Sequence, residues 1–283
     1  MKKFFKVALL SLLLILPTSV FAKEKEIVTL GKDLTSAQRE EILRELNPSD
    51  DAKIIEVTNK EEYEYLGDVL SSREIGNKAI SSAIVKYTGK GINVELSPNI
   101  VGVSENSYRN AMTTAGVENA YVYVTAPGRV TGTAALTGIL KSYEEVTGEK
   151  IPEDVKKVAN EEVVVQTQLA KDVGDEKTND VINVVKSEMA SKMPQSKEEV
   201  RAIIDSVDSQ YNIGLSESSK EGLTTLFNNM KNADIDWKKV ANKVGEYSKK
   251  ANEFLNSPEG EKAVQDTKNF IERFIDFIVS LFK

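Results

Sequence analysis

The chain has 283 residues, with 37 basic and 44 acidic side chains, a formal net charge of −7, and neither cysteine nor histidine. Without thiols and imidazoles it lacks the usual ligands of structural zinc, haem and iron–sulfur centres, and it cannot form a Ser-His-Asp triad. An acidic chain is also repelled by the phosphate backbone of nucleic acids. We therefore expect no cofactor, no metal site and no nucleic-acid partner.

The first 22 residues have the pattern of a secretory signal peptide. Lys2, Lys3 and Lys6 precede an apolar run over residues 7–17, and Ala22 ends a small-residue cleavage pattern. The apolar run is shorter than the roughly 20 residues that span a bilayer, although an uncleaved anchor is the alternative interpretation. We predict export through a cleavable signal peptide, to the exterior or the cell envelope. Cleavage removes three lysines and takes the net charge from −7 to −10.

Residues 23–150 alternate β-prone runs with helical segments, which predicts a mixed α/β (or α+β) domain. The expected strands cover residues 27–30, 52–57, 83–88, 92–96 and 120–125. A glycine-rich stretch over residues 89–91 separates the third run from the fourth, and it predicts that these two strands form a hairpin. Helices are expected to begin at Asp33, Thr35 or Ser36, at Asn59, at Ser104 or Asn106, and at Thr131 or Thr133.

From residue 151 onward the apolar residues recur at helical spacing, with no convincing alternation of period two. The helical segments are 153–171, 177–192, 196–211, 217–231, 236–255 and 258–282. This pattern predicts an all-α domain over residues 151–283, ending in an amphipathic helix. The expected boundary, at residues 148–152, has no Gly/Ser linker, so we expect the two halves to pack closely.

The most informative segment is the loop that follows the strongest strand signal, residues 120–125, and opens the next helix. Glycines let the backbone approach a ligand, the free N–H groups at a helix start attract anions, and an arginine adds positive charge. The segment fits neither a Walker loop nor a dinucleotide-binding fingerprint. A tight strand-to-helix connection without a ligand is the alternative. The candidate ligand-binding residues are Gly128, Arg129, Thr131, Gly132 and Thr133.

Acidic residues form two other patterns. Asp172, Asp175, Glu176 and Asp180 cluster around Gly174, which suits either a loosely bound hard cation or, as we favour, a solvated turn between helices. Neighbouring carboxylates also occur along predicted helices. Because adjacent residues on a helix point apart, we interpret these pairs as helix surface rather than as catalytic dyads. They are 40–41, 61–62, 144–145 and 161–162.

The last predicted helix is apolar over a wide arc. This arc predicts contact with a membrane surface or a protein partner, although packing of the helix on the rest of the chain is the simpler alternative. Few basic residues accompany the arc, which weakens attraction to anionic lipid. The candidate contact residues are Phe270, Phe274, Phe277, Ile278 and Phe282.

Several of these stretches together resemble the YpuA-like family, exported proteins of Firmicutes. The resemblance covers most of the chain after residue 22 and is strongest over residues 27–148. It implies an exported protein with a mixed first half and a helical second half, and it brings no established activity or catalytic residues. The segments that carry it include Leu30-Gly31-Lys32-Asp33-Leu34, Ser81-Ser82, Tyr108-Arg109-Asn110-Ala111 and Gly132-Thr133-Ala134-Ala135-Leu136.

These observations favour a non-catalytic envelope or extracellular protein that binds a partner or wall component, with no catalytic residue assigned. One alternative is a hydrolase of cell-wall glycan that uses only carboxylates, which requires two Asp or Glu side chains about 5–10 Å apart in a cleft. Another is a membrane-surface protein held by its terminal helix.

Overall fold

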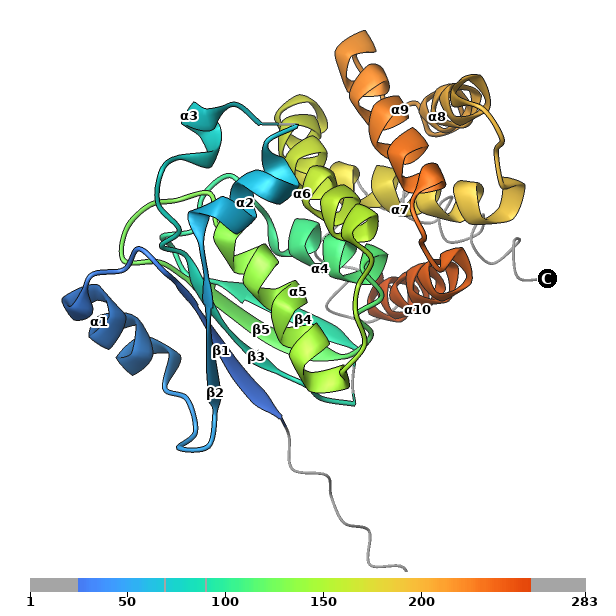
Figure 1. The fold of residues 1–283 in the computed structure, drawn as a ribbon. Coiled ribbons are helices and arrows are strands. Elements are labelled where there is room, and N and C mark those ends of the chain that lie inside the picture. Colours follow the sequence, from blue (N-terminus) through green and yellow to red (C-terminus); the bar gives the residue numbers. More distant parts are fainter. Residues whose placement is uncertain (1–24, 69, 90, 256–283) are drawn as a thin grey trace, which may run out of the picture.

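A computed structural model describes residues 25–255, apart from 69 and 90, and the chain folds into a sheet that is followed by a stack of helices (Figure 1). The predicted signal peptide (1–22) and the terminal apolar arc (Phe270 to Phe282) lie outside the described residues. An α/β first half and a helical second half are confirmed, since every strand found in the described residues lies before residue 126.

The sheet has five strands, in the order β2-β1-β3-β5-β4. Four of them run in one direction, and the central β3 runs against its neighbours β1 and β5. Their bounds are β1 Glu26–Gly31, β2 Lys53–Val57, β3 Ser82–Lys86, β4 Ile92–Leu96 and β5 Ala120–Thr125.

The predicted hairpin of the third and fourth strands is wrong. The two strands do not pair; β5 lies between them, antiparallel to β3 and parallel to β4. After β3 the chain crosses the position of β5, and the Gly91 N–H donates to the side chain of Asn119 at 2.7 Å. The run Ala120–Thr125 is the most β-prone of the chain, and pairing on both edges buries it better than a hairpin would.

The two faces of the sheet are covered differently. Helix α1 (Ser36–Leu46), opened by a capping box at Thr35, packs on one face, where alternate residues of β1 and β3 form a small core. The opposite face carries α4 (Glu105–Thr114) and α5 (Thr133–Thr147). Short helices α2 (Asn59–Leu66) and α3 (Ser72–Ile75) follow β2. Consecutive residues of β1 and β3 are buried because both faces of these strands are covered, whereas burial alternates along most of β4 and β5.

In the second half, α6, α7 and α10 pack on α4, and α6 also packs on α5 (Figure 1). The two remaining helices lie farther out, with α9 on α6 and α8 on α7. Most begin and end where the sequence pattern places them, because Ser196 and Ser216 cap two of them and Gly174 ends another. Their bounds are α6 Glu153–Val173, α7 Asp175–Lys192, α8 Lys197–Tyr211, α9 Glu217–Asn232 and α10 Trp237–Leu255.

One hydrophobic core runs through both halves, from the inner face of the sheet to α10. A buried ion pair lies within this junction, where Nζ of Lys186 on α7 is 2.6 Å from Oε1 of Glu162 on α6. Thr114 of α4 donates to the other oxygen of Glu162 at 2.5 Å, and Lys186 also donates to the carbonyl of Asn110 at 2.9 Å. The first half therefore supplies polar partners to the second.

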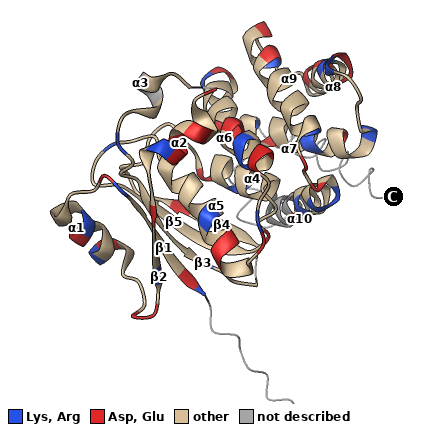
Figure 2. Cartoon of the chain, viewed as in Figure 1, with Lys and Arg blue, Asp and Glu red and all other residues tan. Residues whose placement is uncertain are grey.

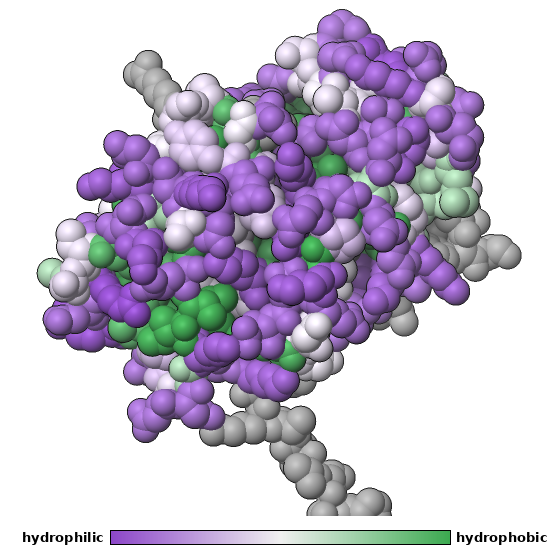
Figure 3. Space-filling view, viewed as in Figure 1, coloured by the Kyte–Doolittle hydropathy of each residue, from purple (hydrophilic) through white to green (hydrophobic). Residues whose placement is uncertain are grey.

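Acidic and basic segments are interspersed along the helices (Figure 2), and the visible surface is mostly hydrophilic (Figure 3). Figure 3 shows one compact apolar area over β2, an edge strand on which Ile54 is 42% exposed. Lys53 and Glu56 flank Ile54 and put charge on that edge, which disfavours further strand pairing. Within the described residues, no helix is long and apolar enough to cross a bilayer.

Candidate functional site

The carboxyl ends of β1, β2, β4 and β5 meet at one edge of the sheet, because these four strands run in the same direction. Loops at such an edge commonly hold ligands in α/β proteins. The predicted loop, residues 128–133, lies at this edge between β5 and α5. The sequence therefore placed the loop correctly relative to the strand and the helix on either side of it.

The end of β1 is closed by the segment that leads into β3. The Asp33 N–H donates to the carbonyl of Ala79 at 3.0 Å, and the Ala79 N–H donates to the Asp33 carboxylate at 2.8 Å. The approach is so close that a Cβ on Gly31 would lie 2.3 Å from the Ala79 oxygen. No room is left for a ligand at this point of the edge.

The loop after β5 is fastened to the loop after β4. The Val130 N–H donates to the carbonyl of Asn99, and the Val101 N–H donates to the carbonyl of Val130, both at 2.9 Å. The side-chain amide of Asn99 also donates to the carbonyl of Ala126 at 2.7 Å. Two loops that are distant in sequence thus form one unit with fixed backbone positions.

Gly132 fixes the other end of the loop, where α5 begins. Its φ of +88° lies in the left-handed region, and an added Cβ would lie 2.4 Å from the hydroxyl of Tyr108. That buried hydroxyl donates to the Gly132 carbonyl at 2.6 Å. A side chain at Gly132 would therefore strain the backbone and displace Tyr108 from its partner.

The five predicted loop residues fall into two groups. Arg129 and Thr131 are exposed, whereas Gly132 is buried and Gly128 and Thr133 are half-buried. Among the residues that the structure describes, no carboxylate forms an ion pair with Arg129, which makes it a free cation at the edge of the sheet.

A buried carboxylate that sequence reasoning missed lies at the start of α5. Glu62 is 2% exposed, and it accepts hydrogen bonds from Thr133 Oγ1 at 2.9 Å and from Asn59 Nδ2 at 3.2 Å. Burial raises the pKa of Glu62 to about 7, and the negative charge of Asp33 adds to the shift. Near this helix start the Ala135 N–H donates to the Ser81 hydroxyl at 3.0 Å. The first residues of α5 are thus already hydrogen-bonded to protein groups, namely the carboxylate of Glu62 and the hydroxyl of Ser81.

Interpreting the neighbouring carboxylates as helix surface was wrong for three of them. Glu62, Glu161 and Glu162 are buried, whereas Glu61 is half-buried and pairs with Lys141 at 2.6 Å. The helical phase contained the missing signal, since Glu162 lies in register with Val155, Val158 and Leu169 on the inward face of α6.

The acidic cluster around Gly174 is dispersed in the structure. Asp172 accepts hydrogen bonds from Ser216 and Ser219 at the start of α9, which ties that helix to the end of α6. Asp180 is half-buried, and burial together with Glu176 raises the pKa of its carboxyl to about 7. Over the described part of the chain, no three carboxylates are grouped so that they could hold a metal ion.

Comparison with known proteins identifies relatives over most of the chain. A family model described as "Protein of unknown function (DUF1002)" matches residues 30–247. The chain is 45% identical over 258 residues to "Uncharacterized protein YpuA" of Bacillus subtilis (strain 168), an alignment that covers 90% of this chain and 86% of that protein. No solved structure matches. The resemblance inferred from sequence is confirmed, and the match extends from β1 into α10.

Proposed function

This chain belongs to the family described as proteins of unknown function (DUF1002), and from that premise we propose that it is an exported, non-catalytic protein that binds an anionic partner or cell-wall component through the loop 128–133. The signal-peptide pattern of residues 1–22 supports export. The loop supports binding, because it offers a free cation on a fixed backbone.

The observation that carries the proposal is the contrast between the fixed backbone of the loop and the exposed side chains on it. Hydrogen bonds to Asn99 and Val101 hold Val130, and Tyr108 holds Gly132, while Arg129 and Thr131 face solvent. A backbone that is already ordered loses little conformational entropy when a ligand binds. Nothing in the core requires an arginine at this exposed position.

The chemistry of the loop favours a carboxylate or phosphate ligand. A guanidinium presents parallel N–H donors that match two oxygens of such a group, and the hydroxyl of Thr131 can donate a further hydrogen bond. Glu62 lies close to the start of α5 and interacts with Thr133, so its charge disfavours an anion at the helix terminus itself. The anion would therefore lie on Arg129, outside the sheet edge.

Co-sedimentation of the purified mature chain, residues 23–283, with isolated cell-wall sacculi tests the proposal. We expect the mature chain to pellet with the sacculi. We expect Arg129→Gln to lower the affinity for the sacculi at least about tenfold, because a charge-assisted pair contributes about 1.5–3 kcal/mol. The matched control is Arg44→Gln, which removes the same charge from the exposed surface of α1. Equal binding by wild type and Arg129→Gln would exclude the loop as the binding site.

A parallel assay with liposomes separates the envelope proposal from attachment through the terminal helix. Binding to sacculi that survives truncation after Ser257 supports the loop. Binding to liposomes alone, lost on the same truncation, would instead support a membrane-surface protein held by the terminal apolar arc. Pelleting with neither would redirect the search to a protein partner, by crosslinking through residue 129.

A further inference from the structure

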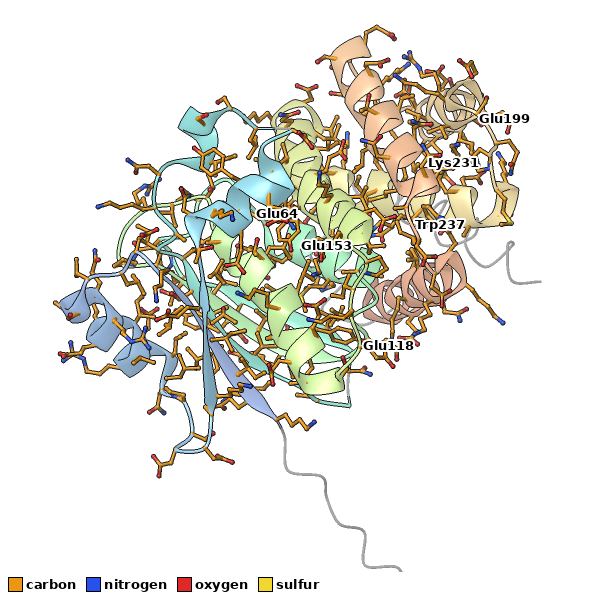
Figure 4. The ribbon with its side chains drawn as sticks, viewed as in Figure 1. Glu64, Glu118, Glu153, Glu199, Lys231 and Trp237 are labelled. Atoms are coloured by element: carbon orange, nitrogen blue, oxygen red, sulfur yellow. The ribbon has the colours of Figure 1, made fainter. Side chains whose placement is uncertain are left out.

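A second candidate site lies away from the sheet edge, in a hollow of about 360 Å³ between the end of α2, the first turns of α6 and the last turns of α9. We call it the α6 groove. In Figure 4, Glu64 on α2 lies to the left of α6 and Lys231 on α9 lies to its right. The polar side chains that line the groove include Tyr65, Asp68, Asp154, Lys157, Glu161 and Asn229.

Glu161 is the buried polar group of this groove, with only 7% of its surface exposed. Its two carboxylate oxygens lie 3.1 and 3.0 Å from the same donor, Nδ2 of Asn229 on α9. One shared amide donor leaves most of the hydrogen-bonding capacity of a carboxylate unused. Burial raises the pKa of Glu161, and only the Asn229 amide opposes that shift.

Among the described residues, no cation balances Glu161. Lys157 lies one helical turn before it but pairs with Asp68, at 3.2 Å, on the other side of the groove. In the part of the chain that the structure describes, no lysine or arginine forms an ion pair with Glu161. A buried carboxylate without a cationic partner is costly, and a cation from outside would relieve that cost.

The rest of the groove has the same sign of charge. Three carboxylates, those of Asp68, Asp154 and Glu161, line it together with one lysine. Figure 2 shows acidic segments on both α2 and α6, with a basic segment between them on α6. An anion is repelled by this lining, and a neutral hydroxyl group would leave the charge of Glu161 unbalanced. An ammonium group satisfies both the charge and the unused acceptors.

We propose that the α6 groove binds a small polar ligand through a primary ammonium group, with Glu161 as its ionic partner. Asn229 holds the carboxylate in place from α9, and the ring of Tyr65 forms part of the wall. The lining of the α6 groove is negatively charged, whereas the loop at the sheet edge carries a positive charge. Each of the two proposals can therefore be tested without the other.

A titration of the isotope-labelled mature chain, followed through the side-chain amide signal of Asn229, tests the site. The probe is cadaverine, a linear diamine, and its matched control is the diol of the same chain length. We expect the diamine to shift the signal saturably and the diol to leave it unchanged. A diol that binds as well as the diamine would overturn the requirement for an ammonium group.

Variants locate the interaction. Glu161→Gln should weaken diamine binding by at least about tenfold, because the charge-assisted bond is lost. Glu64→Gln removes the same charge from the exposed surface of α2 and should bind nearly as wild type does. If Glu161→Gln fails to fold, Asp154→Asn takes its place, with a smaller expected loss. Undiminished binding by a folded Glu161→Gln protein would refute the site.

Discussion

The junction of the two halves and the edge of the sheet each bury a glutamate, and they treat its charge in opposite ways. At the junction of the two halves, Glu162 is fully buried, and Lys186 lies 2.6 Å away with only 1% of its side chain exposed. At the edge of the sheet, Glu62 is buried to nearly the same extent, but its hydrogen-bond donors within the described residues are the uncharged side chains of Thr133 and Asn59. The first region holds a compensated ion pair, whereas the second holds a carboxyl whose pKa is raised to about 7.

The difference shows that the extent of burial alone does not decide the charge state of a buried carboxylate. Desolvation acts on both groups, but a cation at hydrogen-bonding distance offsets it at the junction. Burial lowers the pKa of Lys186, and the neighbouring Glu162 opposes that shift. The sheet edge is therefore expected to respond to pH near neutrality, because the pKa of Glu62 is raised to about 7.

Removing the cation from the junction should have the largest effect. Lys186→Met leaves Glu162 buried without a counter-charge, and we expect a loss of about 3–5 kcal/mol in the free energy of unfolding. Chemical denaturation at neutral pH measures it. The control is Lys197→Met, which breaks a half-exposed pair with Glu221 and should cost less than about 1 kcal/mol. Similar losses in both variants would mean that the junction gains nothing from its pair.

Neutralising the carboxyl at the sheet edge should have an intermediate effect of opposite sign. The pKa of Glu62 is about 7 in the folded chain against an ordinary 4.5, so ionisation destabilises the fold increasingly between these two pH values. Glu62→Gln should therefore raise the free energy of unfolding by about 2–3 kcal/mol at about pH 8, and the advantage should vanish near pH 4.5. A difference between variant and wild type that does not change with pH would contradict the assignment.

Deleting one hydroxyl tests how rigidly the edge is held and should have the smallest effect. Tyr108→Phe leaves the Gly132 carbonyl without its buried donor, and we expect a loss of about 1–2 kcal/mol together with faster amide exchange in the loop. Tyr121→Phe is the control, because its hydroxyl donates to Glu95 at 3.1 Å near the surface. Unchanged exchange in Tyr108→Phe would show that the loop does not depend on this bond.

Local patterns predicted most elements well, and they failed where a partner came from far along the chain. The apolar periodicity gave helix limits within a few residues, and the structure shows that Ser196 and Ser216 cap two of these helices and that Gly174 ends another. The supposed hairpin failed because strand order depends on competition among all strands, and β5 is the better partner for both β3 and β4. The helical phase of Glu162 was readable in advance, but Lys186, its partner on α7, was not.

The sequence by itself determined the class of fold, the family, the change from a mixed first half to a helical second half and the place of the loop 128–133 between a strand and a helix. These features follow from periodicity, propensity and capping, which act over a few residues. Only the tertiary structure decided that β5 separates β3 from β4, that Tyr108 holds Gly132, and that Glu62, Glu161 and Glu162 are buried with different partners. Those outcomes depend on desolvation and on contacts between residues far apart in the chain, which no local pattern encodes.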